Sequence, residues 1–276
     1  MSNFIEKTVL SIQSTFQDMF ESDEIANRQG LMQSLDTRVR LVSILLLIIL
    51  CNISSSWQFL CLMIVYSIFV AVLSKVPIKS YIFRVSSVSV VFTGIVLIPS
   101  LFNIVKPGSP LIYIGRNLYI TSNGALSASI FIMRSFVSLS FIYILILSTK
   151  WVEILKAFRY FKLPKIFSAT LDMSFRYITL FLDVTSNMFL ARKSRNVGQS
   201  KGKSERRFVA SSMGNLLIRS EHLSSEVYSA MISRGYKGEY KTISDFKFGI
   251  FDVVWILFNI SFFTAIFLIK GGRLWI

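Results

Sequence analysis

The stretch LMQSLDTRVRLVSILLLIILCNIS, residues 31–54, decides the fold class of this chain. Asp36 is placed to cap the start of a helix, and Arg38 and Arg40 then lie at a boundary with water. From Leu41 onward the side chains are almost all apolar, as the interior of a lipid bilayer requires. Backbone groups in lipid must be hydrogen-bonded within the segment, so this run is predicted to be a helix.

Four further apolar runs follow the same pattern, and all five approach the ~20 residues that cross a ~30 Å hydrocarbon core. The expected spans cover residues 40–56, 58–75, 85–104, 126–148 and 248–269. A basic link is expected from Lys75 to Arg84, and an Asn-Gly turn at residues 123–124. The chain of 276 residues is 53% hydrophobic, with a mean hydropathy of +0.59. We therefore predict an all-α integral membrane protein with about five transmembrane helices and additional long amphipathic cytoplasmic helices.

The net charge of +15 is concentrated between residues 150 and 247. This interval holds 18 of the 30 Lys and Arg residues and 8 of the 15 Asp and Glu residues. Basic segments of membrane proteins stay in the cytoplasm and face anionic headgroups, so we expect this interval and the N-terminus to be cytoplasmic. Because the basic residues flank or separate apolar spans, the charge indicates contact with the lipid bilayer and no nucleic acid.

Four regions are expected from these patterns. They are an N-terminal amphipathic region at 1–37 with an apolar stripe from Ile5 to Phe20, a membrane domain of four spans at 38–149, a cytoplasmic helical domain at 150–247, and a C-terminal transmembrane helix at 248–276. Within the cytoplasmic domain, helices are predicted at 151–161, 165–195 and about 208–234. Pro164 breaks the first of these helices, and a basic link at 196–207 separates the other two.

Two short motifs recur where the long cytoplasmic helices are predicted to end. The first arginine motif is Ser194-Arg195-Asn196, and the second is Ser233-Arg234-Gly235. Gly and Asn are the residues that best adopt the left-handed conformation just past a helix end, which holds each arginine near a favourable helix dipole. The arginines could merely complement these helix ends or bind lipid phosphates. Their repetition favours a second interpretation, in which they fill two equivalent pockets of a two-fold symmetric partner.

The sequence resembles the CbiQ/EcfT family, the transmembrane coupling component of energy-coupling-factor (ECF) transporters. The resemblance covers nearly the whole chain and rests on SLDTRVRLVSILLL, MRSFVSLS, LSTKWVEILKAFRYFKLP, MSFRYITLFLDVTSNMFLARKSRNVG and SSEVYSAMISRGYKGEY. It implies that the two arginine motifs end coupling helices that dock into grooves of an ABC-type ATPase dimer. This chain departs from the family pattern with Ser for Ala in both motifs and Asn for Gly in the first. Ser is similar in size to Ala, and Asn, like Gly, tolerates the left-handed conformation, so we expect both motifs still to dock.

The N-terminal residues 4–40 resemble the metal-transporting CbiQ branch, which implies cobalt or nickel as cargo. The resemblance also implies a separate substrate-capture membrane subunit, CbiM-like. No Gly-x-x-x-x-Gly-Lys-Ser/Thr pattern occurs in the sequence, so we expect a non-catalytic subunit whose partner ATPase binds ATP and Mg²⁺. His222 is the only histidine and no metal-ligand cluster is present, so no cofactor is expected in this chain and the transported metal is expected in another subunit.

Four further residues are candidates for structural support: Arg134, Pro164, Asp172 and Arg176. Arg134 lies within a span and is expected either to extend to the membrane interface or to hold the membrane helices against the coupling helices. Asp172 and Arg176 are one helical turn apart and are expected to pair.

Two other classes of protein fit the sequence less well. An integral-membrane transferase needs close carboxylates for a metal and a diphosphate, whereas Asp172 and Asp183 are eleven residues apart. A self-sufficient secondary transporter normally places ionisable residues within its spans, and these spans contain almost none. Both alternatives are therefore disfavoured.

Overall fold

A computed structural model describes residues 10, 11, 14, 22–54, 56–101, 110–113, 119–161, 164–195, 202–237 and 248–269. The chain divides into two compact units. The bundle unit comprises residues 22–154 and 246–276, and the arm unit comprises residues 1–21 and 155–245. The predicted N-terminal stripe from Ile5 to Phe20 lies almost wholly outside the described residues, as does Asn196 of the first arginine motif.

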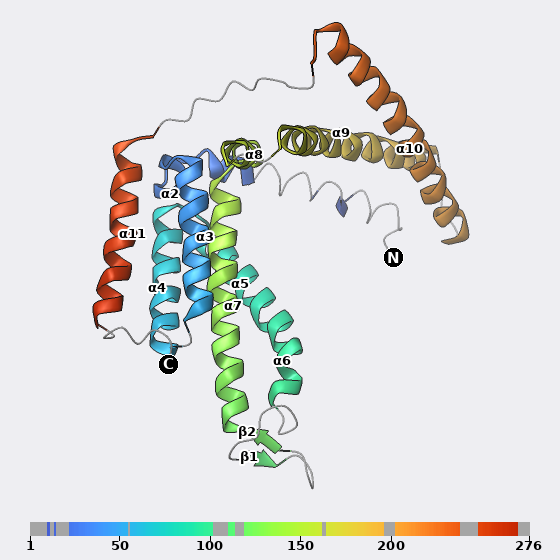
Figure 1. Ribbon diagram of the computed structural model, residues 1–276. Coiled ribbons are helices and arrows are strands. Elements are labelled where there is room, and N and C mark those ends of the chain that lie inside the picture. The colour runs from blue at the N-terminus through green and yellow to red at the C-terminus, as the bar shows by residue number, and fades with distance from the viewer. Residues whose placement is uncertain are drawn as a thin grey trace. The chain divides into compact units, whose positions relative to one another are not determined.

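Helix α7 (Ser122–Ser148) is the central helix of the bundle unit (Figure 1). The elements that contact it are α3 (Thr37–Ile53), α4 (Trp57–Leu73), α5 (Ile78–Val88), the π turn η1 (Ser89–Thr93) and α6 (Gly94–Leu101). The short helix α2 (Leu31–Ser34) packs on α4, and α11 (Ile250–Ile269) packs on α3. The core between these helices is mainly apolar and includes Ile44, Leu60, Met63, Val137, Phe141 and Ile144. Because lipid tails are as apolar as these side chains, close van der Waals packing holds such a bundle together in a membrane.

The outward faces of the bundle helices are apolar as well. Phe83 and Phe92 are each 74% exposed. Residues 78–100 and helix α7 are both long and apolar enough to cross a membrane, and most of each segment lies outside the core. Helix α4 and residues 250–264 form shorter apolar helices. So much exposed apolar surface is stable in lipid but not in water, which fits the predicted all-α membrane protein.

Two helix boundaries differ from the prediction. The segment expected to begin near residue 85 starts at Ile78, so Arg84 lies inside a helix rather than in a basic link. Pro77 occupies the N-cap of this helix, where its missing N–H leaves no intrahelical bond unmade. Helix α7 begins at Ser122, so the Asn-Gly pair at 123–124 forms its first turn instead of a separate turn.

The start of α3 follows the prediction at Asp36 but not at Arg40. The Asp36 carboxylate caps the helix by accepting a hydrogen bond from the backbone N–H of Arg38 at 2.9 Å, and it also pairs with the Arg38 guanidinium at 3.1 Å. Arg40 was expected at the water boundary, but it is only 2% exposed. Residues four apart share a helix face, so the position that turns Ile44 into the core also turns Arg40 inward.

A small antiparallel sheet precedes α7, which the sequence analysis did not predict. Strand β1 (Pro110–Tyr113) pairs with β2 (Tyr119–Thr121), with Ile112 opposite Ile120 and Tyr113 opposite Tyr119. Thr121 is also the N-cap of α7, so the second strand leads directly into the central helix. Two strands this short are marginally stable alone and depend on the helices that they connect.

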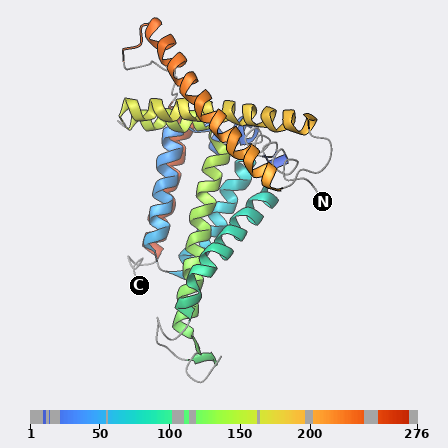
Figure 2. The same ribbon diagram turned by 90° about the vertical axis from the view of Figure 1, so that its right-hand side faces the viewer.

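The arm unit contains the long amphipathic helices. Helix α8 (Trp151–Tyr160) begins in the bundle unit and enters the arm unit at Leu155. Helix α9 (Lys165–Arg195) has the predicted bounds, whereas α10 (Gly202–Ser233) begins earlier than the predicted Phe208. The basic residues before Phe208 are helical because Lys, Arg, Glu and Ser tolerate a helix far better than Gly or Pro does. Figure 2 shows α10 crossing α9.

Candidate functional site: two arginine helix ends

A corner between α8 and α9 sets the direction in which α9 runs. Arg159 Nε donates to Ser168 Oγ at 2.9 Å, and Arg159 Nη2 lies 3.9 Å from Asp172 Oδ2. The Pro164 carbonyl accepts the N–H of Ser168 at 3.3 Å, so the proline begins α9. The ion pair that the described contacts give Asp172 is therefore with Arg159, in place of the expected Arg176. The residue spacing within one helix cannot predict a contact between two helices that meet at a corner.

Helices α9 and α10 are joined where they cross. The rings of Phe189 and Phe208 meet edge to face with centroids 5.3 Å apart. The Arg192 guanidinium lies 4.4 Å from the centroid of the Phe208 ring, and Arg192 Nη2 donates to Ser204 Oγ at 3.0 Å. Edge-to-face and cation–π contacts each add to simple apolar burial. This contact near one end of both helices leaves their other halves free to diverge.

The second arginine motif forms a complete helix termination at the end of α10. Gly235 adopts the left-handed conformation, with φ of 83°, as predicted. Its N–H donates to the Ile232 carbonyl at 2.9 Å, and the N–H of Tyr236 donates to the Met231 carbonyl at 3.0 Å. These are the two hydrogen bonds of a Schellman motif, which ends a helix by satisfying carbonyls that would otherwise lack partners. The turn leaves Arg234 exposed at the helix end.

The first arginine motif ends α9 in a similar way as far as the structure describes it. Arg195 is the last residue of α9 and is exposed. The hydroxyl of Ser194 donates to the Leu190 carbonyl at 3.1 Å, and the hydroxyl of Ser233 in the second motif donates to the Ser229 carbonyl at 3.0 Å. In both motifs the serine is therefore folded back onto its own helix, which leaves the arginine as the outward-facing group.

The electrostatics of the two helix ends favour an anionic or carbonyl-rich partner. Among the residues that the structure describes, neither Arg195 nor Arg234 has an ion-pair partner. Arg192 and Lys193 add positive charge to the last turn of α9. A guanidinium presents several donors in a rigid fork that matches carboxylate and carbonyl oxygens. The arm unit thus offers two such forks, one at the end of each of two crossing helices.

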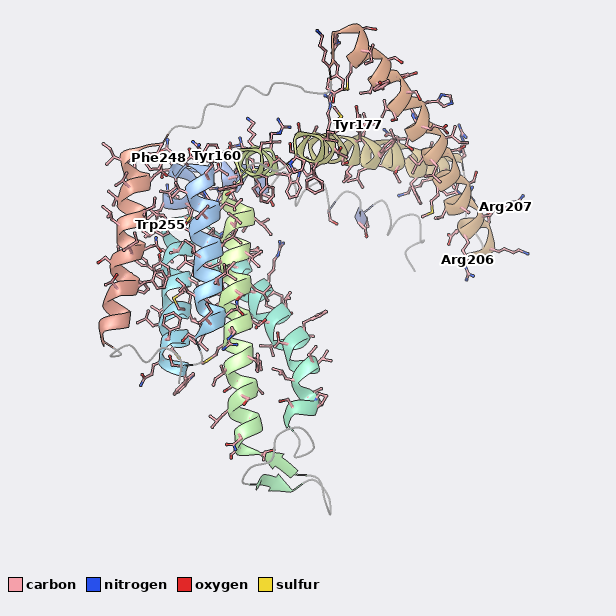
Figure 3. All side chains as sticks on the ribbon, viewed as in Figure 1. Tyr160, Tyr177, Arg206, Arg207, Phe248 and Trp255 are labelled. Atoms are coloured by element: carbon pink, nitrogen blue, oxygen red, sulfur yellow. The ribbon has the colours of Figure 1, made fainter. Side chains whose placement is uncertain are left out.

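An apolar cavity lies between the first half of α9 and the last half of α10, and its volume is ≈ 550 Å³. Its lining includes Met173, Tyr177, Phe181, Leu223, Val227 and Met231. Tyr177 is labelled on α9 in Figure 3. Tyr236, which directly follows the second arginine motif, also lines this cavity. The turn that exposes Arg234 therefore also shapes one wall of the cavity. Sequence analysis missed this site, although the apolar face of each helix was a signal for it.

Arg134 lies on α7 and is half-buried within the bundle unit. Its Nη2 donates to the backbone carbonyl of Ser54, the C-cap of α3, at 2.9 Å, and its guanidinium carbon lies 5.4 Å from the centroid of the Phe131 ring. Arg134 thus holds α7 against the C-terminal end of α3. The sequence did not predict this contact, and extension to the interface or support of the coupling helices stays a prediction.

The described part of the chain contains no group of three or more His, Cys, Asp or Glu side chains placed to hold a metal ion. His222 lies exposed on α10. The described site offers recognition by its two exposed arginines and apolar contact along its cavity.

Comparison with known proteins agrees with these features. The chain matches the family model of the cobalt transport protein CbiQ over residues 29–243, a region that includes both arginine motifs. It is 26% identical over 275 residues to an uncharacterised protein of Methanocaldococcus jannaschii, which covers 99% of this chain and 94% of that protein. It is 26% identical over 219 residues to the energy-coupling factor transporter transmembrane protein EcfT of Listeria innocua, which covers 75% of this chain and 81% of that protein. The exposed apolar helices together with this match over most of the chain identify a membrane protein of a transport system, and the chain belongs to the CbiQ family of cobalt transport proteins.

Proposed function

We propose that this chain is the transmembrane coupling subunit of an ECF-type importer. It passes the conformational change of a partner ABC-type ATPase dimer to a separate substrate-capture membrane subunit. The observation that carries the proposal is the pair of exposed arginines, Arg195 and Arg234, at the ends of two crossing helices. The family match and the EcfT relative support the same role.

In the proposed mechanism, the ATPase dimer binds this chain at its two arginine motifs and moves it through them. Two identical ATPase subunits have two equivalent grooves, and one chain with two similar helix ends can fill both of them. ATP and Mg²⁺ are bound by the ATPase, whose opening and closing moves the two helix ends. The α9–α10 crossing, held by Phe189 and Phe208, makes α9 and α10 move together. This chain is then a mechanical, non-catalytic part of the transporter.

The apolar cavity between α9 and α10 supports a second partner. Its lining suits contact with a hydrophobic surface and not with the charged surface of a soluble ATPase. We propose that the substrate-capture subunit, CbiM-like, contacts this part of the arm unit. Movement of α9 and α10 would then act directly on the subunit that holds the cargo.

The proposed topology places the N-terminus and the arm unit in the cytoplasm, with the bundle helices crossing the membrane several times. The excess of Lys and Arg between residues 150 and 247 supports this orientation. Cobalt is the proposed cargo, on the strength of the family description. Uptake of radioactive cobalt by cells that express the whole transporter, with and without excess nickel, tests this choice. If cells took up cobalt equally well without this chain, the choice of cobalt as its cargo would be wrong.

The central experiment tests the arginines directly. We expect the double variant R195E/R234E to lose copurification with the ATPase, because a carboxylate replaces the donor fork at both helix ends. R219E is the matched control, since Arg219 is also exposed on α10 but lies outside both motifs. The R219E variant should retain the ATPase. Wild-type recovery of the ATPase by R195E/R234E would show that the motifs do not dock it.

A further inference from the structure

A buried polar cluster lies beside two of the places where the chain passes between its units. The chain leaves the bundle unit after Ile154, within α8, and returns at residue 246, shortly before α11. Glu153 directly precedes the first passage, and Asp252, in the first turn of α11, follows the second. Both carboxylates bind the beginning of α3, because Asp252 accepts the N–H of Asp36 and Glu153 accepts the hydroxyl hydrogen of Thr37, close in the chain to the buried Arg40. We call these four side chains the Arg40 cluster: Asp36, Arg40, Glu153 and Asp252.

Arg40 joins the beginning of α3 to the end of α7. Its Nη1 donates to the backbone carbonyl of Ser148, the last residue of α7, and to Thr149 Oγ1 at 2.7 Å. Its Nη2 donates to the carbonyl of Leu35 at 2.7 Å. One guanidinium thus binds two oxygens at the junction between α7 and α8, and a third oxygen just before α3.

The carboxylates attach two more helices to the same place. Asp252 is 1% exposed and accepts the N–H of Asp36 at 2.7 Å and the N–H of Gly249 at 2.8 Å. Glu153, in the first turn of α8, accepts the hydroxyl hydrogen of Thr37 at 3.3 Å. The first turns of α8 and α11 are therefore both fixed to the beginning of α3. Trp255 (Figure 3) reinforces this attachment by donating from its ring N–H to Ser43 Oγ at 3.2 Å.

Arg134 provides a comparison within the same pair of helices. It too bridges α7 and α3 through a hydrogen bond to a backbone carbonyl, that of Ser54. Within the described part of the chain, its contacts involve α3 and α7 alone. Arg40 therefore performs the same bridging but also lies at the attachment of α8 and α11.

Stability alone does not explain the Arg40 cluster. Desolvation of several charges offsets most of their attraction, and apolar side chains often stabilise a core equally well. Capping accounts for the bond to Ser148 and for the Asp36 carboxylate, but not for the two carboxylates of α8 and α11 that bind the beginning of α3. A closely packed set of directional bonds does give a fixed geometry, so that displacement of one attached helix displaces the others.

We propose that Arg40 is the positioning residue that transmits movement of α8 and α11 to α3 and α7. The inference rests on the proposed coupling function and deepens it. The arginine motifs receive the motion of the ATPase, and the Arg40 cluster passes that motion into the bundle unit. Arg40 contacts neither nucleotide nor cargo in this mechanism.

The test uses the whole complex, purified through a tag on this chain and reconstituted into lipid vesicles. ATP hydrolysis and uptake of radioactive cobalt are measured on the same vesicles. Lysine at position 40 keeps the charge but cannot make the three forked bonds, so we expect R40K to retain the ATPase while cobalt taken up per ATP falls about tenfold. E153A removes the attachment of α8 at a half-buried position and should lower the same ratio.

R134K is the matched control, because it weakens the other arginine bridge between α3 and α7. It should lower the unfolding temperature without changing cobalt uptake per ATP. A normal ratio in both R40K and E153A would overturn the inference, and so would an equal loss in R134K. If R40K does not fold, E153A decides between the same two outcomes. Failure of the proposed function is a different result, namely a wild-type chain that purifies without an ATPase.

Discussion

The bundle unit and the arm unit use arginine in opposite ways. In the bundle unit, Arg40 is buried and donates to three oxygens of the chain itself. In the arm unit, Arg195 and Arg234 end their helices in exposed positions without an ion-pair partner among the described residues. A buried guanidinium bonded to oxygens of its own chain stabilises a geometry, whereas an exposed one without an ion-pair partner is available to another molecule. Under the proposed function, this difference separates the part that carries a movement from the part that receives it.

The largest effect on stability is expected from D252A in the bundle unit. Removal of the carboxylate leaves the buried N–H of Asp36 and the N–H of Gly249 without their acceptor, which should lower the free energy of unfolding by about 3 kcal/mol. Thermal unfolding in detergent can be followed by the reaction of buried Cys51 with a thiol-reactive fluorophore. D183A, at an exposed position on α9, should leave the curve unchanged. Equal curves for the two variants would mean that the buried cluster contributes no stability.

A smaller effect is expected from F189A in the arm unit. Phe189 is 5% exposed and supplies half of the ring contact between α9 and α10, so its loss should cost about 2 kcal/mol locally. Amide hydrogen exchange should accelerate in both helices while α3 and α7 remain protected. L217A removes a side chain that is 71% exposed and should leave exchange as in the wild type. Faster exchange throughout the bundle helices would contradict the division into two separately stabilised units.

The two glycines of α10 are predicted to respond with opposite signs. G235A forces a Cβ onto a residue with φ of 83° and should destabilise the end of α10 by about 1 kcal/mol. G214A lies within the helix, where no atom would lie within 4 Å of the new Cβ, and should stabilise α10 by a similar amount. Hydrogen exchange of α10 measures both changes. The same sign for both would show that the left-handed turn is not required at Gly235.

The smallest effect is expected from S194A/S233A. Each hydroxyl donates only to a carbonyl of its own helix, so the helices should change by less than about 0.5 kcal/mol. Alanine also restores the pattern of the family that the chain resembles, so recovery of the ATPase should equal that of the wild type. Loss of the ATPase in this variant would show that the hydroxyls, and not only the arginines, contact the partner.

The parts of the fold that depend on local pattern could be predicted closely. Helix α9 has the predicted bounds, Asp36 caps α3 and Gly235 is left-handed, because periodicity, capping and backbone freedom act over a few residues. The prediction failed where a tertiary contact overrode such a pattern. Asp172 pairs across a corner with Arg159, and residues 123–124 form part of α7 instead of a turn.

For the candidate site, sequence alone determined that the chain belongs in a membrane, where its two arginine motifs lie, and which family they resemble. Those conclusions follow from composition and short-range spacing, which a single chain displays in full. Only the tertiary structure decided that Arg40 is buried where it joins α3 to the end of α7 and that an open apolar pocket lies between α9 and α10. Both features join residues far apart in the chain, and the packing of helices, which one sequence does not display, determines which of those residues meet.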